Sequence, residues 1–533
     1  MKLTQLVSAC ALAVSMVLSA AVQAATPKDA LIIGMSMNNL LSLDPANATG
    51  NDVVEINANM YDSLVELDPA NTYKVLPALA ESWSIAPDNT SITFKIRKGV
   101  KFHSGNPLTA QDAAWSLQRV VKINLALASV WKAYGFTPKN VEEKIRATDA
   151  QTLVIDLPEP TDPNLVIYTL GTSVSAVVLD SKKVMQNEKD GDLGRTWLTT
   201  NEAGSGPFVF NEWRQKDVLT MTRFDGYWRG APKLRRVLLR HMTESQTLRL
   251  MLERGDIDIA NGMSVPDVEA MKKNPKVVVE SVKRGNVYYV AVSMKDPKFA
   301  DKRVRLAIRN LIDYKGINDT VMPNYGIFHQ RPVQLGLPAT LPEPGYKFDV
   351  PAARKLLAEA GFPNGFKTTI RVLSDPPFIN IATNLQATLA LGGIEAAVVP
   401  GTGNQVYGAM RDRNFEIIVG RGGGGAEPHP HSSLRSLVYN PDNRDEAKLT
   451  NFQGWRTSFI SPEINALIEK AEVEKDVKKQ TEMYQEVQRL YDSQVGAIQP
   501  VSQMVETVVL QKDIRNYRSH PSATTHWRDV YKQ

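Results

Sequence analysis

Two spacings of apolar residues alternate along the whole chain. Residues 91–97 alternate apolar and polar side chains, which is typical of a half-buried strand, and Thr109–Asp112 is a capping-box pattern that predicts the start of a helix. Residues 287–293 form a β-rich run, and residues 304–312 then place apolar side chains at the i, i+3, i+4, i+7 and i+8 positions of a helix. Strands and helices that follow one another in this way predict a mixed α/β architecture.

Helix ends are marked further along the chain, and its length requires more than one core. Pro351–Ala360 predicts a helix that ends before Gly361, where glycine favours a left-handed cap, and Ser461–Glu463 predicts the start of another helix. A chain of 533 residues is too long for one hydrophobic core, so we expect at least two domains. Neither a repeat nor a long low-complexity linker interrupts the sequence, so short crossing segments should join the domains.

The first 24 residues have the pattern of a secretory signal peptide. Lys2 is followed by an almost uninterrupted apolar run at residues 6–18 and by small residues up to Ala24, so we expect cleavage near Ala24 and a periplasmic protein. The run is shorter than the roughly 20 residues that span a bilayer, which argues against a membrane helix. Cys10 closes a lipoprotein-like box, but the apolar run continues past it, so we do not expect lipidation there.

Composition excludes several classes of protein. Hydrophobic residues make up 43% and charged residues 22% of the chain, which is ordinary for a globular protein and unlike a disordered one. Cys10 is the only cysteine, so the mature chain should have no disulfide, thiol nucleophile or thiolate metal site. The formal net charge of +5 is mild, and the basic stretches at 233–240 and 475–479 are broken by other residues, so we expect no nucleic-acid partner.

Familiar catalytic and cofactor motifs are missing from the sequence. It has no Gly-x-Ser-x-Gly, His-Glu-x-x-His or Walker motif, so we expect no enzyme activity and no cofactor, and nothing supports a secreted hydrolase. Gly420–Gly425 does match Gly-x-Gly-x-x-Gly after a predicted strand at 415–419. A dinucleotide site needs a helix at the third glycine, however, and we expect residues 426–431 to be extended.

The segment Glu427-Pro428-His429-Pro430-His431 leaves three interpretations open. A strand-like conformation would project Glu427, His429 and His431 from one side, and imidazole with carboxylate suits zinc or nickel. His429 and His431 are therefore weak candidates for a metal or metal-chelate site. Polyproline geometry would splay the same side chains apart. In the second interpretation the segment contacts an organic ligand beside a flexible glycine run, and in the third it is a purely structural loop.

Longer phrases of the sequence resemble a known family. Leu79–Trp83, Ile92–Gly105 and Leu108–Asp112 together resemble the signature of the family 5 extracytoplasmic solute-binding proteins, the oligopeptide, dipeptide and nickel group of ABC importers. Six further phrases fit in the expected order: Leu43–Pro45, Gly204–Phe208, Tyr227–Gly230, Leu252–Asp258, Val304–Ile308 and Leu356–Phe362. The resemblance covers nearly the whole mature chain.

This resemblance implies an α/β, two-lobed periplasmic binding protein of type II, similar to cluster C, with an extra domain inserted in the first lobe. The implied bounds are residues 25–70, 200–286 and 505–533 for lobe I, 71–199 for the inserted domain and 287–504 for lobe II. It also implies a monomer that closes around a small-molecule or peptide ligand and delivers it to an ABC permease and ATPase complex in the inner membrane. A sensory or chaperone-like role on the same fold stays open.

The resemblance also points to a ligand site. In peptide-binding relatives the loop that matches residues 417–431 carries an aspartate for the peptide α-amino group, and this chain has Gly424 at that position. Without that charge we expect weak binding of simple peptides, although Glu427 could substitute from a shifted loop. His429–Leu434 resembles a phrase of a nickel-type relative, and opine-type solutes also remain open. The side chains expected to meet such a solute are Arg421, His429, His431 and Trp455.

Overall fold

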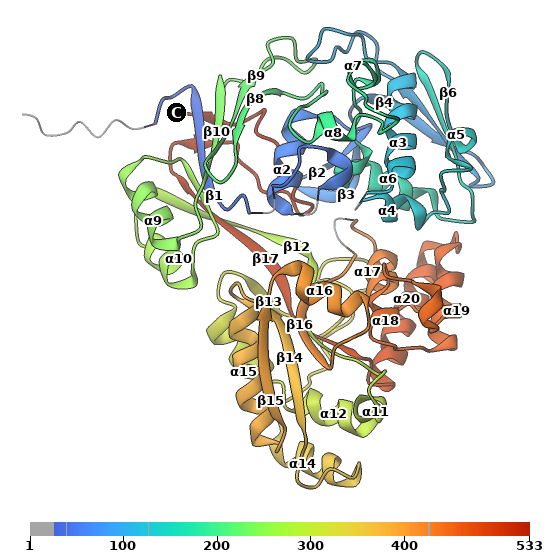
Figure 1. The fold of residues 1–533 in the computed structure, drawn as a ribbon, viewed down its shortest axis with the longest axis vertical. Coiled ribbons are helices and arrows are strands. Elements are labelled where there is room, and N and C mark those ends of the chain that lie inside the picture. The colour runs from blue at the N-terminus through green and yellow to red at the C-terminus, as the bar shows by residue number, and fades with distance from the viewer. Residues whose placement is uncertain (1–25, 39, 49, 126, 425–426) are drawn as a thin grey trace, which may run out of the picture.

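Two bodies joined by a pair of long strands make up the molecule (Figure 1). The computed structural model describes residues 26–533 except 39, 49, 126 and 425–426. The predicted leader, its cleavage site and Cys10 lie outside the described residues. Within the described part of the chain, no helix combines the length and the apolar character that a membrane crossing requires.

The two joining strands are β12 (Val277–Val292) and β17 (Ile498–Gln511). They pair antiparallel in the middle of an 11-stranded sheet whose order is β15-β14-β16-β12-β17-β11-β1-β10-β9-β8, with β13 paired to β17. Their register shifts between Lys283 and Val287 and again between Tyr288 and Tyr289, where Val287 is the first residue of the large buried cluster of the lower body. A bulge of this kind bends a strand pair locally, so this crossing is the natural place for the two bodies to move relative to each other.

Three large buried clusters fill the bodies, and a small fourth lies beside them. We call the parts around these three clusters lobe I, with cluster members between Leu31 and Val530, the inserted domain, between Ala46 and Val178, and lobe II, between Val287 and Met504. Lobe I and the inserted domain form the upper body, and lobe II forms the lower one (Figure 1). Leu198, within the predicted bounds of the inserted domain, packs into the lobe I cluster, and Leu64, within the predicted bounds of lobe I, packs into the cluster of the inserted domain. Each of these two cores therefore includes residues from the predicted range of the other.

In lobe I, apolar strands form a mixed half-sheet. The strand β1, with sequence ALIIGM, runs parallel to both β10 and β11 and is buried along almost its whole length, as expected of a central strand. The remaining elements of this part are η1 (Pro45–Asn47), α2 (Asn51–Met60), β8 (Phe208–Arg214), β9 (Val218–Arg223), β10 (Arg236–His241), α9 (Ser245–Arg254), β11 (Ile259–Asn261), α10 (Val265–Met271), β18 (Ile514–Arg515) and β19 (Tyr531–Lys532), with β1 at Ala30–Met35.

The inserted domain is built on an antiparallel sheet of order β4-β5-β7-β6. The predicted strand at 91–97 is confirmed as β5, and the predicted capping box is confirmed at the start of α3, where Thr109 and Asp112 cap each other. The elements here and at the junction with lobe I are β2 (Val65–Asp68), β3 (Asn71–Pro77), β4 (Ala80–Ile85), β5 (Ser91–Ile96), α3 (Ala110–Ile123), α4 (Ala128–Lys132), α5 (Val141–Lys144), β6 (Ile145–Asp149), β7 (Thr152–Asp156), α6 (Pro163–Thr172), η2 (Val174–Ala176), α7 (Ser181–Gln186) and α8 (Arg195–Leu198).

Lobe II carries a parallel set of strands, β14, β15 and β16, beside β12. The predicted helix ends are confirmed, since Gly361 follows α14 with a φ of +91° and the Ser461 side chain caps α19. Its elements are α11 (Pro297–Ala300), α12 (Lys302–Asn310), α13 (Tyr314–Gly316), η3 (Ile317–Val321), β13 (Gly326–Phe328), α14 (Val350–Glu359), β14 (Lys367–Leu373), α15 (Phe378–Leu391), β15 (Glu395–Gly401), α16 (Gly403–Arg411), β16 (Ile417–Gly422), α17 (Pro430–Leu437), η4 (Asp445–Ala447), α18 (Gln453–Arg456), α19 (Pro462–Glu472) and α20 (Val477–Ser493).

One local prediction is wrong. Residues 426–431 were expected to be extended, but only His429 and the described residues just before it are non-helical, and α17 begins at Pro430. The physical reason is that proline suits the first helical position, where its missing N–H is not needed, while the His429 side chain caps the helix by accepting from the His431 N–H at 3.2 Å. His431 therefore lies inside a helix, and the strand-like projection of both histidines from one side does not occur.

Candidate functional site

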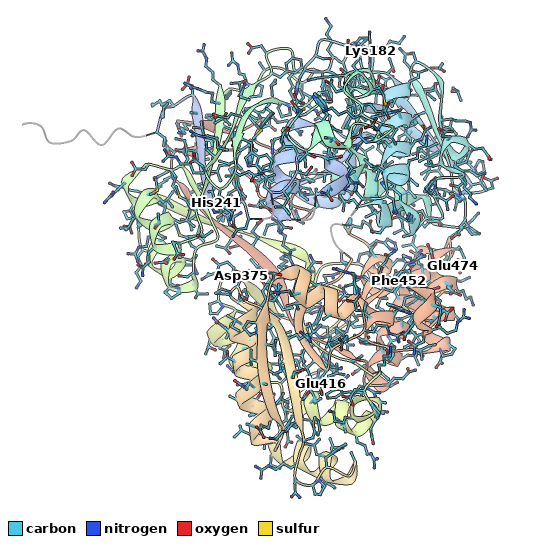
Figure 2. The ribbon with its side chains drawn as sticks, in the orientation of Figure 1. Lys182, His241, Asp375, Glu416, Phe452 and Glu474 are labelled. Carbon is cyan, nitrogen blue, oxygen red and sulfur yellow. The ribbon has the colours of Figure 1, made fainter. Side chains whose placement is uncertain are left out.

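A cavity of about 940 Å³ lies between the two bodies, next to the β12–β17 crossing. Its lobe II wall is formed where β14, β15 and β16 end, and its lobe I wall by residues that follow β1 and β11 and precede α2. Figure 2 shows Asp375 of lobe II and His241 of lobe I on opposite sides of this region. In open α/β sheets the carboxyl ends of parallel strands are the usual place for a ligand.

Three helices begin at the wall of this cavity. Asn51 opens α2, Phe378 opens α15 and Gly403 opens α16, and all three residues line the cavity. The α16 start is fixed by a capping box in which Thr402 and Gln405 satisfy each other's backbone N–H groups. The N-terminal end of a helix carries a partial positive charge, so all three helices favour negative charge inside the cavity.

Arg411, Arg421 and Arg456 add three full positive charges to the lobe II wall. Arg411 ends α16, Arg421 lies on β16 and Arg456 ends α18, so three separate elements converge here. Within the described residues no carboxylate oxygen lies within 4.0 Å of any of these guanidinium groups, whereas many other arginines of the chain have such a partner.

The cavity arginines affect one another and a shared tyrosine. Burial lowers the pKa of Arg456, and the positive charge of Arg411 lowers it further. Arg456 donates from Nε to the Thr450 carbonyl at 2.7 Å, and the Tyr407 hydroxyl accepts from the Arg421 N–H at 3.1 Å. Burial raises the pKa of Tyr407, while Arg421 and Arg456 oppose that rise, which places both cations close to one phenol.

Three carboxylates also line the cavity, two of them from lobe I. Glu506 is held in an ion pair by Arg284 of the crossing, and Arg284 also donates to the His520 carbonyl. Burial lowers the pKa of Arg284 to about 10. Asp52 lies in the first turn of α2 and Asp375 just before α15, where each faces the positive end of its own helix. The cavity wall is therefore positively charged around the three lobe II arginines, and it carries both signs of charge elsewhere.

Among the residues predicted from the sequence, Arg421 lines the cavity and Gly424 lies two residues beyond its rim residue Gly422. A Cβ atom at Gly424 would approach the Ser433 N atom to 2.7 Å and the Ser432 Cβ to 2.8 Å. An aspartate at this position would therefore require α17 to shift. In this conformation the packing of α17 on the loop leaves no room for a side chain at position 424.

Glu427 lies at a contact between lobe II and the inserted domain. Its carboxylate accepts from Thr169 Oγ1 of α6 at 2.8 Å and from the Ser432 hydroxyl of α17. Burial raises the pKa of Glu427, although both hydroxyl groups and Arg435 oppose that rise. Glu427 also borders a second cavity, of about 310 Å³, on the side of the crossing strands where Arg284 and Gln334 lie.

His429 and His431 pack against helix α20 rather than lining the large cavity. Both rings contact Tyr484 edge-on, and His431 Nδ1 is 3.1 Å from the Tyr484 hydroxyl. Burial lowers the pKa of each histidine, and for His431 the neighbouring Arg435 adds to the effect. Throughout residues 26–533, gaps excepted, no group of three or more His, Cys, Asp or Glu side chains is arranged to hold a metal ion.

Trp455 is buried in lobe II and is also outside the set of residues that line the large cavity. Its Nε1–H donates to the Arg444 carbonyl at 3.1 Å, and the Arg413 guanidinium lies over its ring at 4.6 Å from the centroid. Sequence reasoning missed Arg411, Arg456 and the three helix starts. The Thr402–Gln405 capping pattern was the one local signal available for any of them.

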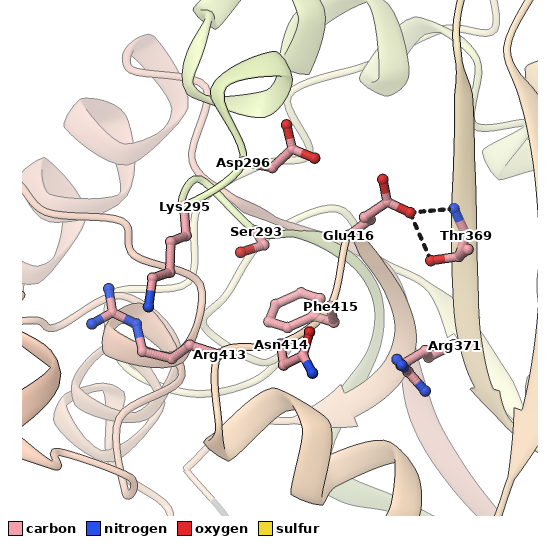
Figure 3. A pocket seen from close by; sticks show the side chains of 9 residues that line it. All are labelled: Ser293, Lys295, Asp296, Thr369, Arg371, Arg413, Asn414, Phe415 and Glu416. Atoms are coloured by element: carbon pink, nitrogen blue, oxygen red, sulfur yellow. Dashed lines mark hydrogen bonds between the residues drawn. The ribbon is translucent and has the colours of Figure 1, made fainter.

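Another pocket, of about 350 Å³, lies at the opposite end of the lobe II strands (Figure 3). Glu416 accepts from the N–H and the hydroxyl of Thr369 at 2.8 Å, and from Lys298 at 3.1 Å. Lys295 and Arg413 both pair with Asp445. Most charges of this pocket are therefore neutralised inside the protein, which distinguishes it from the cavity between the bodies.

Comparison with known proteins places the chain in a family. Residues 74–445 match the model of the bacterial extracellular solute-binding proteins, family 5 Middle. Heme-binding protein A of Haemophilus influenzae is 26% identical over 486 residues, which cover 87% of this chain and 85% of that protein. The probable D,D-dipeptide-binding periplasmic protein DdpA of Escherichia coli K12 is 27% identical over 493 residues, covering 88% and 87% respectively.

Solved structures agree with this assignment at the level of the fold. The structure of the binding protein MoaA from A. tumefaciens R10 in complex with mannopinic acid has a TM-score of 0.80 to this chain at 23% identity, and the match covers 95% of this chain and 100% of the other. The predicted mixed α/β fold of cluster C type is confirmed by such matches. The family model covers more than half of the residues, and on that basis the chain belongs to the family 5 bacterial extracellular solute-binding proteins, the non-enzymatic solute receptors of ABC transporters.

Proposed function

We propose that this extracytoplasmic receptor captures a small organic solute in the 940 Å³ cavity, closes lobe I and lobe II around it, and delivers it to an ABC permease. The observation that carries the proposal is the position of the cavity, which has walls from both lobes and lies beside the shifted register of β12 and β17. A solute that contacts both walls is bound best in the closed form, so binding shifts the open-closed equilibrium by its differential affinity.

The domain bounds predicted from the sequence belong to this proposal. Residues 287–504 move as one body around their own buried cluster, and lobe I moves together with the inserted domain. The contact between Glu427 and Thr169 and the bond from Arg435 to the Ala133 carbonyl at 3.3 Å already join lobe II to the inserted domain in the present conformation. These two contacts therefore lie on the surfaces that move relative to each other when the crossing strands bend.

For the solute, we propose a compound other than a simple di- or tripeptide. The names of similar proteins include a heme, a D,D-dipeptide and mannopinic acid, so the scaffold accepts several chemistries. Gly424 offers no carboxylate for a peptide ammonium, which favours an opine-like or other organic solute. A metal chelate is the alternative that the sequence leaves open, but His429 and His431 pack against Tyr484 outside the large cavity, so they do not support it.

Two measurements on the protein from its own host test the proposal. Native mass spectrometry should show a single organic mass on the protein, and stripping that compound should increase the radius of gyration in small-angle scattering, with its return restoring the compact form. A heterogeneous pool of peptides would contradict the non-peptide solute, and a nickel or zinc adduct would favour the chelate. An unchanged radius alongside tight binding would contradict closure.

We also propose that the leader is removed near Ala24 and that the mature protein is periplasmic. The supporting observation is the sequence pattern of residues 1–24. Mass spectrometry of the mature protein should place its N-terminus at Ala25, in the osmotic-shock fraction. A retained leader or a lipid on Cys10 would contradict this.

A further inference from the structure

We infer that the solute carries at least two oxyanionic groups, carboxylate or phosphate, which Arg411, Arg421 and Arg456 bind from the lobe II wall of the cavity. This inference rests on the proposed function, because it names the chemical class of the solute that the same cavity would take.

The partners of the other lobe II arginines show what the cavity arginines lack. Arg309 pairs with Asp492 at 3.0 Å, and Arg435 donates to both oxygens of Glu472 at 2.9 Å. Arg305, which pairs with no carboxylate in the part of the chain that the structure describes, donates to four backbone carbonyls and so is also satisfied. A guanidinium withdrawn from water without such partners is costly, and lobe closure would withdraw the cavity arginines further.

Because the cavity arginines lie close together, their mutual repulsion adds to the free-energy cost of withdrawing them from water. Arg411 and Arg456 are close enough for the charge of one to lower the pKa of the other, and no described carboxylate within 4.0 Å offsets either. Arg421 is close enough to Arg284 to lower its pKa as well. An anionic solute would supply the missing negative charge to Arg411, Arg421 and Arg456 at once, which makes the closed form of the loaded protein favourable.

The number of anionic groups follows from the placement of the donors. The three arginines come from the ends of α16 and α18 and from β16, so they approach the cavity from separate elements. One carboxylate or phosphate accepts one guanidinium fork in a bidentate pair, so three forks on separate elements are served best by two or more oxyanions. The starts of α15 and α16 and the Tyr407 hydroxyl provide further donors on the same wall.

The test uses the mature protein stripped of its solute and three probes: citrate, inorganic pyrophosphate and neutral trimethyl citrate. Isothermal titration at constant ionic strength should show binding of citrate, pyrophosphate or both, and none of the ester. Arg421→Gln and Arg456→Gln should each weaken anion binding by tenfold or more, since each removes a charge-assisted pair. Arg411→Gln, at an exposed helix end where folding is not at risk, should weaken it as well. Binding of citrate alone would assign carboxylate groups, and of pyrophosphate alone phosphate groups.

The matched control is Arg444→Gln, an exposed arginine paired with Asp442, which should leave anion binding unchanged. The inference is overturned if the ester binds as well as citrate, if neither anion binds, or if the three cavity variants bind as the wild type does. A native solute that proves neutral or cationic, yet still compacts the protein in scattering, overturns this inference and leaves the proposed function standing. A stripped protein that no compound from its host compacts overturns the proposed function itself.

Discussion

Two regions of lobe II carry similar residue types and use them in opposite ways. The segment from Glu427 to Arg435, which we call the latch, contains a carboxylate, two histidines and an arginine, and each of these side chains has a polar partner inside the protein. The cavity wall contains Arg411, Arg421 and Arg456, and none of them has a carboxylate partner among the described residues. The contrast shows that a ligand site is marked by missing partners rather than by reactive residue types.

The same contrast separates stability from function. The latch joins lobe II to the inserted domain through Thr169 and Ala133, so its polar groups help to hold the present arrangement of the bodies. The cavity wall accumulates positive charge that the folded protein itself does not neutralise. Mutations in the latch should therefore change stability first, and mutations in the wall should change binding first.

The largest effect should come from the latch ion pair. Arg435→Met removes two bonds of 2.9 Å to Glu472 and leaves that carboxylate buried without its cation. Breaking a buried pair on one side should lower the free energy of unfolding by about 3 kcal/mol. Urea denaturation measures this loss. The control Arg444→Met breaks an exposed pair with Asp442 and should change stability by less than about 0.5 kcal/mol. Equal effects of both variants would remove the distinction between the latch and the surface.

A pH-dependent effect should follow at His431. Burial and Arg435 lower the pKa of His431 well below its ordinary 6.5, so the folded protein keeps the ring neutral while the unfolded chain binds a proton below that pH. The unfolded state then binds more protons, and the contribution of His431 to stability falls as the pH drops below 6.5. The wild type should therefore lose stability relative to His431→Gln over this range. Other titrating groups are common to both proteins, so a difference that is constant with pH would contradict the buried neutral ring.

A smaller effect is expected on the inserted-domain side of the latch. Thr169→Val removes the hydroxyl that donates to Glu427 at 2.8 Å while keeping the volume of the side chain. The variant also loses the 2.8 Å bond between the Thr169 and Tyr134 hydroxyls, so the free energy of unfolding should fall by about 2 kcal/mol. Solute affinity should not fall, because Thr169 is outside the large cavity. Calorimetric unfolding and titration of the same variant measure both quantities. A loss of affinity without a loss of stability would assign the latch to the ligand site.

The fold could be predicted to the extent that its signals are local. The capping box at Thr109–Asp112, the cap at Ser461 and the left-handed Gly361 each depend on a few neighbouring residues, and each is where the sequence placed it. The segment at Pro430 was harder, because the residue before a proline is extended while the proline itself suits the first turn of a helix. The structure satisfies both preferences, since His429 is extended and α17 begins at Pro430.

The site could be predicted only in part, for a physical reason. Arg421 was identified because it is a charged residue of the loop at 417–431, which the family resemblance indicates as a ligand site. Arg411 and Arg456 look like any other arginine at the end of a helix, and nothing in the sequence shows that no carboxylate folds next to them. Trp455 shows the converse, since its indole N–H is satisfied by the Arg444 carbonyl, a partner that tertiary structure alone supplies.

The smallest change in stability should come from the cavity wall, and it should have the opposite sign. Arg421→Gln removes one of several converging positive charges, so the stripped protein should keep its free energy of unfolding within about 0.5 kcal/mol or become slightly more stable. Its affinity for citrate or pyrophosphate should fall at the same time, since the lost charge is the one that an anion would neutralise. Chemical denaturation with and without the anion measures both effects on one protein. A clear loss of stability in the stripped protein would show that Arg421 supports the fold, as Arg435 does, and would end the contrast between the two regions.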